Sequence, residues 1–232
     1  MPPLTPRQTN YLQAMGVTIW RDQSAPLGPA SQPGVAENPL AAATVPQAET
    51  GDWATLIQAV SQCQRCELHK SRTQTVFGVG NRQAELLIIG EAPGADEDRQ
   101  GEPFVGRAGQ LLNEMLKAIG LQRQQVFIAN ILKCRPPNNR DPKAEEAAEC
   151  SEYLLRQIAL IQPKLILAVG RIAAQHLLKT DMALGRLRGK VHRHPDTGVP
   201  LVVTYHPAYL LRTPADKRKA WEDLLFLRNT IK

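Results

Sequence analysis

One twenty-residue segment constrains the fold more than any other part of the sequence. Residues 90–109 contain five glycines and two prolines, a composition that disfavours both a helix and a strand. The apolar run 86–89 leads into the segment, and a helical pattern of apolar residues begins at Gln110. A loop between a buried strand and a helix is where open α/β sheets bind ligands. We therefore expect a ligand-binding loop, although a long connection with ordinary turns is the alternative.

Further apolar runs alternate with helical patterns along the chain. Strands are expected near 85–90, 126–134, 163–170 and 200–205, and helices at 52–61, 107–119, 142–161, 172–178 and from 214 onward. Near-continuous apolar strands indicate a sheet that is covered on both faces. The sequence thus predicts an α/β fold: a three-layer sandwich with a four-stranded, mostly parallel central sheet and helices on both faces. We place this domain at residues 51–232.

The first fifty residues have a different character. Residues 21–50 contain five prolines among many alanines and polar residues, so we predict a disordered linker. Residues 1–20 then form a short docking-type peptide. Residues 12–20 are similar to the N-terminal tail of the psi subunit of the bacterial replicative clamp loader, which implies a replication protein as the partner of residues 8–20. The alternative is that this peptide packs on its own domain.

Charge and apolar content limit the partners. The net charge is +6, which suits a polyanion such as nucleic acid. No apolar run approaches the roughly 20 residues of a membrane span, so no membrane partner is expected. The first residues lack the pattern of a signal peptide. We therefore expect a cytoplasmic protein whose cysteines are reduced.

The four cysteines suggest one metal centre. Cys63 and Cys66 are separated by two residues, and Cys134 and Cys150 follow far along the chain. A two-residue spacing lets two thiolates reach one centre. Four thiolates suit either a tetrahedral zinc ion or a [4Fe–4S] cluster, and the spacing does not separate these two.

Polar side chains stand at or just after the ends of the expected strands. These residues are Glu91, Asn130, Arg171 and His206. Because parallel strands end at one edge of the sheet, we expect these side chains to converge on a single site. For Asn130, the alternative is a core residue whose amide bonds to neighbouring backbone. A histidine after an apolar strand is also more often structural than catalytic.

These motifs together resemble the iron–sulfur uracil-DNA glycosylases of the family-four type, found in bacteria and archaea. The resemblance extends from about Cys63 to the C-terminus and includes segment 90–109, the four cysteines, Asn130 and the His206-Pro207 pair. It implies a [4Fe–4S] cluster held by all four cysteines. It also implies hydrolysis of the N-glycosidic bond of deoxyuridine, in single- or double-stranded DNA, as the start of base excision repair. We expect a monomer.

The resemblance assigns roles to individual residues. Glu91 and His206 are the expected catalytic residues, and His206 would stabilise the charge that develops on the uracil 2-carbonyl. Phe104 would stack on the extruded base, and Asn130 would read its edge. The substrate-binding set comprises Gly90, Glu91, Ala92, Gly94, Phe104, Asn130 and His206.

The water-activating group is left open. The best-known uracil glycosylases carry an Asp where this chain has Ala92 and a thymine-excluding Tyr where it has Gly94. Glu91, Asp96 and Glu97 are the candidates, and the sequence does not rank them.

Two segments are expected to contact DNA. Residues 185–194 are rich in cations, which suits a phosphate-facing patch, with a solvated basic hairpin as the alternative. Residues 209–211 form an apolar tip that could wedge into the base stack. The expected DNA-binding residues are Arg171, Arg186, Arg188, Lys190, Leu210 and Arg212.

Two other functions agree with parts of the sequence. A zinc-stapled DNA-binding module without catalysis would share the cysteines and the basic patch, but it gives no reason for Phe104, Asn130 and His206 to occur together. A nucleotide-binding enzyme is disfavoured because no Gly-x-x-x-x-Gly-Lys-Ser/Thr loop is present.

Overall fold

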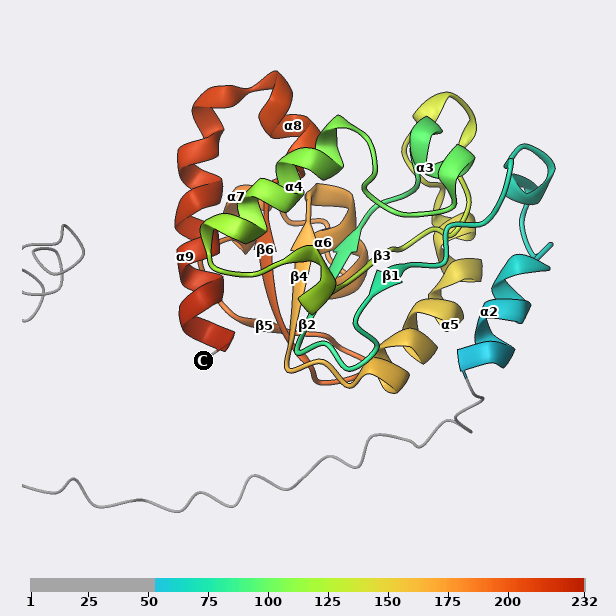
Figure 1. The fold of residues 1–232 in the computed structure, drawn as a ribbon, viewed down its shortest axis with the longest axis horizontal. Coiled ribbons are helices and arrows are strands. Elements are labelled where there is room, and N and C mark those ends of the chain that lie inside the picture. The colour runs from blue at the N-terminus through green and yellow to red at the C-terminus, as the bar shows by residue number, and fades with distance from the viewer. Residues whose placement is uncertain (1–52, 232) are drawn as a thin grey trace, which may run out of the picture. The chain divides into compact units, whose positions relative to one another are not determined.

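The computed structural model describes residues 53–231, which contain a six-stranded sheet in the order β1-β3-β2-β4-β6-β5 (Figure 1). The predicted docking peptide, 1–20, and the predicted linker, 21–50, lie outside these residues. No helix between residues 53 and 231 is long and apolar enough to cross a membrane.

The four central strands are parallel and match the apolar runs of the sequence. They are, in spatial order, β3 (Phe127–Asn130), β2 (Leu86–Gly90), β4 (Leu165–Val169) and β6 (Pro200–Thr204). Every residue of β2, β3 and β4 is buried. This burial explains the near-continuous apolar runs, because both faces of each strand contact a helical layer.

The expected count of four strands is wrong. Two antiparallel edge strands, β1 (Val79–Gly80) and β5 (His192–Arg193), complete the sheet. Each has only two residues, so neither contains the run or alternation that a sequence pattern requires. Backbone hydrogen bonds hold these edges, for example from the Asn81 amide to the Val126 carbonyl at 3.0 Å.

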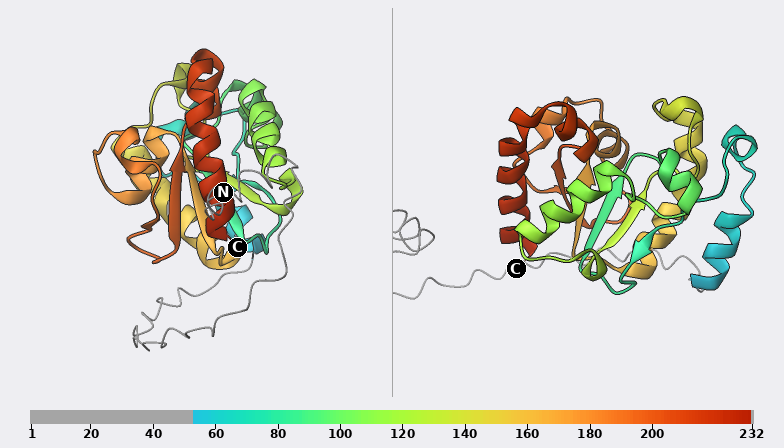
Figure 2. Two further views of the ribbon diagram at one scale, coloured as in Figure 1. Left: turned by 90° about the vertical axis from the view of Figure 1, so that its left-hand side faces the viewer. Right: turned by 45° about the horizontal axis from the view of Figure 1, so that its top comes forward.

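Helices cover both faces of the sheet, as predicted (Figure 2). Alternate residues of the central strands belong to two separate apolar clusters. One cluster includes α5 (Ala144–Ile161), α6 (Arg171–Leu178) and α7 (Leu184–Leu187). The other includes α4 (Arg107–Ala118), α8 (Pro207–Arg212) and α9 (Lys217–Ile231).

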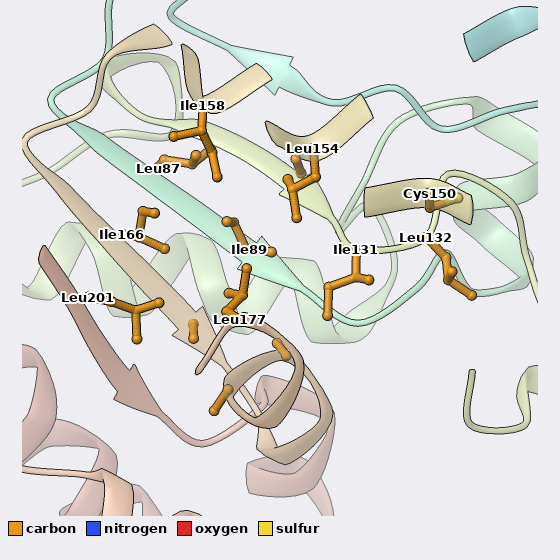
Figure 3. Packing of buried hydrophobic residues seen from close by; sticks show 14 of the residues in the cluster. Leu87, Ile89, Ile131, Leu132, Cys150, Leu154, Ile158, Ile166, Leu177 and Leu201 are labelled. Carbon is orange, nitrogen blue, oxygen red and sulfur yellow. The ribbon is translucent and has the colours of Figure 1, made fainter. Parts of the chain in front are cut away.

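Side chains from strand and helix interlock in the first of these layers. Figure 3 shows Leu87 and Ile89 of β2 beside Leu154 and Ile158 of α5. Helix α2 (Trp53–Ser61) packs on the outside of α5 through Leu56, Val60 and Tyr153. Four 3₁₀ turns, η1 (Glu67–Lys70), η2 (Arg123–Gln125), η3 (Pro137–Asn139) and η4 (Pro214–Asp216), lie in the connections.

Segment 90–109 contains a helix that its glycines and prolines did not predict. Helix α3 (Ala95–Gln100) begins after Gly94, whose amide donates to the Glu97 carboxylate at 3.1 Å. It ends at Gly101, which has a φ of 78°. Glycine favours both of these terminal positions, so here it delimits a short helix. The expectation that this segment has no helix is therefore wrong.

The strand order determines where the connections diverge. Strands β2 and β4 are neighbours, and the chain leaves β2 toward β3 on one side but leaves β4 toward β6 on the other. The registers pair Gly90 with Asn130 and Val169 with Thr204, so the four strands end together. A crevice at such a divergence is the usual ligand site of an open α/β sheet.

Candidate active site

A cavity of about 430 Å³ lies at this carboxyl edge. It draws on the loop after β2, the end of β3, the turn before α5 and the start of α8. Most of the predicted substrate-binding residues line it together. The lining consists of Glu91, Ala92, Pro93, Gly94, Glu97, Phe104, Ala108, Asn130, Pro136, Asn139, Arg140, Asp141, His206, Ala208, Tyr209 and Arg212.

Asn130 lines this cavity and carries an unpaired buried acceptor. Its side chain is 2% exposed, and Oδ1 is buried without a hydrogen-bond partner. The alternative of a core Asn bonded to neighbouring backbone therefore does not describe Oδ1. An unpaired buried polar atom costs about 1–3 kcal/mol. Such a cost is typical of a group whose partner is a ligand.

Gly90 does not line the cavity, but it makes room for the residues that do. A Cβ atom at Gly90 would lie 2.4 Å from Asn130 Oδ1 and 2.7 Å from Phe104 Cζ. Any larger residue would push both side chains aside. The role of Gly90 is therefore to permit the close approach of an amide and an aromatic ring.

Phe104 and His206 stack on each other at the cavity wall. Their ring centroids are 5.5 Å apart, with an angle of 30° between the planes. Phe104 is 6% exposed. Gly170, which has a φ of 99°, passes behind the histidine, and a Cβ there would lie 2.9 Å from His206 Cβ. The imidazole is thus held between a ring and a backbone.

The hydrogen bonds of His206 fix its tautomer. Nδ1 accepts from the Ala208 amide at 3.1 Å as it caps α8, so the proton of the neutral ring resides on Nε2. Burial, with a smaller effect from Arg212, lowers the pKa of His206 to about 4. At neutral pH this side chain is therefore an uncharged Nε2–H donor.

Glu91 is a carboxyl group without a hydrogen-bond partner among the described residues. Burial, together with the nearby Asp141 carboxylate, raises the pKa of Glu91 to about 7, while Arg171 acts in the opposite direction. A carboxyl group with this pKa exchanges protons readily near neutral pH.

The two other candidates for activating the water, Asp96 and Glu97, already bond to other groups of the protein. The Glu97 carboxylate accepts from the amides of Gly94, Val105 and Gly106 at 3.1, 3.1 and 3.4 Å. Asp96 forms an ion pair with Arg99 and does not line the cavity. The geometry thus separates Glu91 from Asp96 and Glu97, which the sequence could not do.

The predicted DNA-binding residues do not form one surface. Arg212 lines the cavity, and Arg171 is exposed near its edge in an ion pair with Asp141 at 3.1 Å. Arg186 and Lys190 are exposed but do not line the cavity.

Arg188 and Leu210 are placed differently from the prediction. Arg188 Nε bonds to Asp223 Oδ2 at 2.7 Å, and its side chain is 13% exposed. Leu210 is 1% exposed within the apolar layer of α4 and α9. Arg188 therefore anchors α9, and Leu210 is not an exposed wedge.

Sequence reasoning missed the contribution of the turn before α5. Asn139, Arg140 and Asp141 all line the cavity, whereas the sequence analysis expected only irregular structure there. Asn138 and Asn139 have φ values of 55° and 53°. The signal was the Asn-Asn pair, because asparagine tolerates the left-handed conformation better than most residues.

The four cysteines line a second, small cavity together with Arg65, His69, Arg72, Lys133, Glu149 and Tyr153. Arg72 Nη1 donates to Cys134 Sγ at 3.1 Å. Among residues 53–231, no group of three or more His, Cys, Asp or Glu side chains is arranged to hold a single metal ion. The donor set consists of sulfur atoms beside cationic side chains, which suits an anionic, thiolate-bound group.

Comparison with known proteins agrees with this geometry. Residues 77–225 match the Uracil DNA glycosylase superfamily. The chain therefore belongs to this superfamily, within its type-4 branch.

Relatives from archaea and bacteria carry the name type-4 uracil-DNA glycosylase. That of Archaeoglobus fulgidus is 48% identical over 165 residues, covering 68% of this chain and 83% of the relative. That of Pyrobaculum aerophilum is 44% identical over 179 residues, covering 75% and 91%. The bacterial relative from Thermotoga maritima is 40% identical over 178 residues, covering 75% and 92%.

The pKa of Glu91 predicts a pH-dependent stability. A pKa raised on folding means that the folded protein holds this proton more tightly, so the stabilisation is complete below about pH 4.5 and is lost as the pH rises through about 7. We expect Glu91→Gln to melt near wild type at pH 5 and above it at pH 8, measured by circular dichroism. Glu85→Gln, at a surface ion pair with Lys164, is the control. A constant difference across this pH range would contradict the prediction.

Proposed function

We propose that this protein removes uracil from DNA by hydrolysing the N-glycosidic bond of deoxyuridine, the first step of base excision repair. The observation that carries the proposal is the unpaired Oδ1 of Asn130, buried in a cavity beside a stacking ring and a neutral histidine donor. The names of the type-4 relatives support the same activity.

Asn130 distinguishes uracil from cytosine. Its amide has one acceptor and one donor group. The acceptor takes the N3–H of uracil, and the donor reaches the 4-carbonyl. Cytosine presents an unprotonated N3 and an amino group at these positions, so both contacts become unfavourable. The buried position of Asn130 makes this mismatch costly.

Phe104 receives the base after it leaves the stack. A flipped base loses its neighbours in the duplex, and an aromatic ring in the pocket replaces part of that stacking. In single-stranded DNA the cost of extrusion is smaller, so the same cavity serves both kinds of DNA. Backbone amides near Glu91 and Ala92 hold the base on the opposite side.

His206 stabilises the leaving group. As the glycosidic bond breaks, negative charge develops on the uracil 2-carbonyl. The Nε2–H of the neutral imidazole donates to this oxygen. A fixed donor in a buried site stabilises such charge without reorganisation during the reaction.

Glu91 takes the proton of the attacking water. Its carboxyl group lines the cavity and has a pKa of about 7, and the other two acidic candidates are engaged elsewhere. Arg171 and Arg212 contact the phosphates on either side of the extruded nucleotide, and Arg186 and Lys190, which are exposed away from the cavity, contact phosphates further along the strand.

Cys63, Cys66, Cys134 and Cys150 hold a [4Fe–4S] cluster. Four thiolates suit either a zinc ion or a cluster, and membership of the type-4 branch favours the cluster. The four cysteines would join the segment before η1, the loop after β3 and helix α5 through this group, which would contribute to stability.

Three further proposals concern the whole chain. Residues 8–20 bind a replication protein, as their resemblance to the psi tail suggests, and anisotropy of a labelled 8–20 peptide with the clamp loader measures this. The protein is a monomer. It acts in the cytoplasm, where its thiols stay reduced and can bind iron. Light scattering and cell fractionation test these two statements.

The sharpest prediction for the proposed reaction concerns Asn130→Asp. The ionised carboxylate keeps the size but repels the 4-carbonyl. We expect uracil excision to fall at least ~100-fold, or roughly 2.7 kcal/mol, while DNA binding persists. Single-turnover cleavage of matched oligonucleotides with U or C, and anisotropy on the same strands, measure both effects. Asn81→Asp, whose side chain caps an exposed turn, is the control. Near wild-type excision by Asn130→Asp would overturn the assignment of the cavity.

The cluster is expected to be structural. Cys150→Ala and Cys63→Ala should lose iron and visible absorption and should melt at a lower temperature, because metal binding and folding are coupled. Iron analysis and thermal melts test this, with Ser151→Ala on the same helix as the control. A colourless variant of full stability would refute the structural role, and stoichiometric zinc in the wild-type protein would refute the cluster.

A further inference from the structure

Two oppositely charged side chains hold the backbone around Phe104. Arg123 Nη2 donates to the Pro103 carbonyl at 2.6 Å, and Nη1 donates to the Phe104 carbonyl at 3.3 Å. On the other side, Glu97 Oε1 accepts from the amides of Val105 and Gly106 at 3.1 and 3.4 Å. A cation thus binds two successive carbonyls, and an anion binds the next two amides. We call Arg123 and Glu97 the charged clamp.

The clamp holds a conformation that the chain would not adopt by itself. Phe104 has a φ of 54°, in the left-handed region that bulky residues rarely enter. Such strain persists only where surrounding contacts impose it, and it is typical of functional sites. Helix α4 adds a steric limit, since a Cβ atom at Gly109 would lie 1.8 Å from the Phe104 carbonyl oxygen.

The clamp also joins the separate walls of the cavity. Glu97 Oε2 accepts from the Gly94 amide, so one carboxylate ties the 91–94 backbone to the Phe104 segment. Arg123 Nη1 reaches Asn113 Oδ1 on α4 at 3.4 Å. Arg123 lies outside the cavity, and both oxygens of Glu97 are engaged with backbone amides.

We propose that Arg123 and Glu97 are positioning residues that hold Phe104 in its left-handed conformation, so that its ring is set for stacking before the base arrives. The proposal rests on the proposed function and deepens it by naming what pre-organises the uracil-stacking ring. In a protein without the clamp, Phe104 relaxes to an ordinary conformation, and each binding event must restore the strained one. Pre-organisation of this kind improves affinity by reducing the ordering needed on binding.

The measurement that reports this effect is the inhibition constant of free uracil. Free uracil requires the cavity but no contact with phosphates. We expect Arg123→Met and Glu97→Gln to raise this constant by about tenfold, the scale of one lost aromatic stacking contact. Arg123→Lys, which keeps the charge but not the two-pronged donor, should fall between Arg123→Met and wild type. Affinity for DNA that carries an abasic site should change little in all three.

A double-mutant cycle separates positioning from general structural damage. In Phe104→Ala no ring remains to be positioned, so adding Arg123→Met should leave the inhibition constant unchanged. An effect of equal size in both backgrounds would mean that Arg123 acts on the cavity without Phe104, which overturns the proposal. Unchanged uracil affinity in folded Arg123→Met and Arg123→Lys would also overturn it. The two arginine variants keep the test decisive if Glu97→Gln does not fold.

Controls distinguish failure of the clamp from failure of the proposed function. Arg228→Met removes an exposed arginine near the end of α9 and should match wild type in uracil inhibition and in melting temperature. If the wild-type protein neither excises uracil nor binds it, the proposed function fails. If wild type does both and the clamp variants bind uracil equally well, only the clamp fails.

Discussion

The site depends on the absence of a side chain at Gly90. Strands β2 and β3 end side by side, and Gly90 is paired in register with Asn130. The Asn130 amide and the Phe104 ring approach its Cα so closely that one added carbon would lie 2.4 and 2.7 Å from them. Packing this close excludes any side chain at position 90 unless Asn130 or Phe104 moves. The parallel register, the Asn130 amide and the Phe104 ring are therefore one connected arrangement.

The cavity contrasts with the structure around it in how its polar groups are paired. The backbone of segment 103–106 is satisfied by Arg123 and Glu97. Asn130 Oδ1 is one of only two buried side-chain polar atoms without a partner among the described residues. The hydrogen bonds of segment 103–106 limit its motion, and the unpaired oxygen of Asn130 leaves a defined place for a ligand group. Arg123 and Glu97, whose polar groups are paired, thus support the site, whereas Asn130, whose Oδ1 is unpaired, is part of it.

The sequence predicted the parts of the molecule that depend on local pattern. The central strands follow apolar runs, and Asn130 and His206 were found because each interrupts or ends such a run. Contacts between residues that are distant in the sequence produce no such local pattern. The guanidinium of Arg188 forms an ion pair with Asp223, 35 residues away, and the residues next to Arg188 in the sequence give no sign of this pairing. Leu210 likewise packs in the apolar cluster that includes α9, and the spacing of apolar residues near Leu210 does not indicate this contact. Helix α3 was not predicted because the glycine content of segment 90–109 was counted without regard to position. Two of these glycines, Gly94 and Gly101, lie at the ends of the helix.

The cysteine centre and the cavity are connected through one buried side chain. Lys133 is 1% exposed, and its Nζ donates to the Asn130 carbonyl at 2.8 Å and to Gln157 Oε1 at 2.7 Å. The same ammonium lies beside Cys134 and Cys150 and forms no ion pair with a carboxylate in the described part of the chain. A buried ammonium needs polar partners, and the Asn130 carbonyl and Gln157 Oε1 supply them here. Lys133 therefore links the cavity lined by the cysteines to the backbone of Asn130, so a side chain outside the active-site cavity still supports the geometry within it.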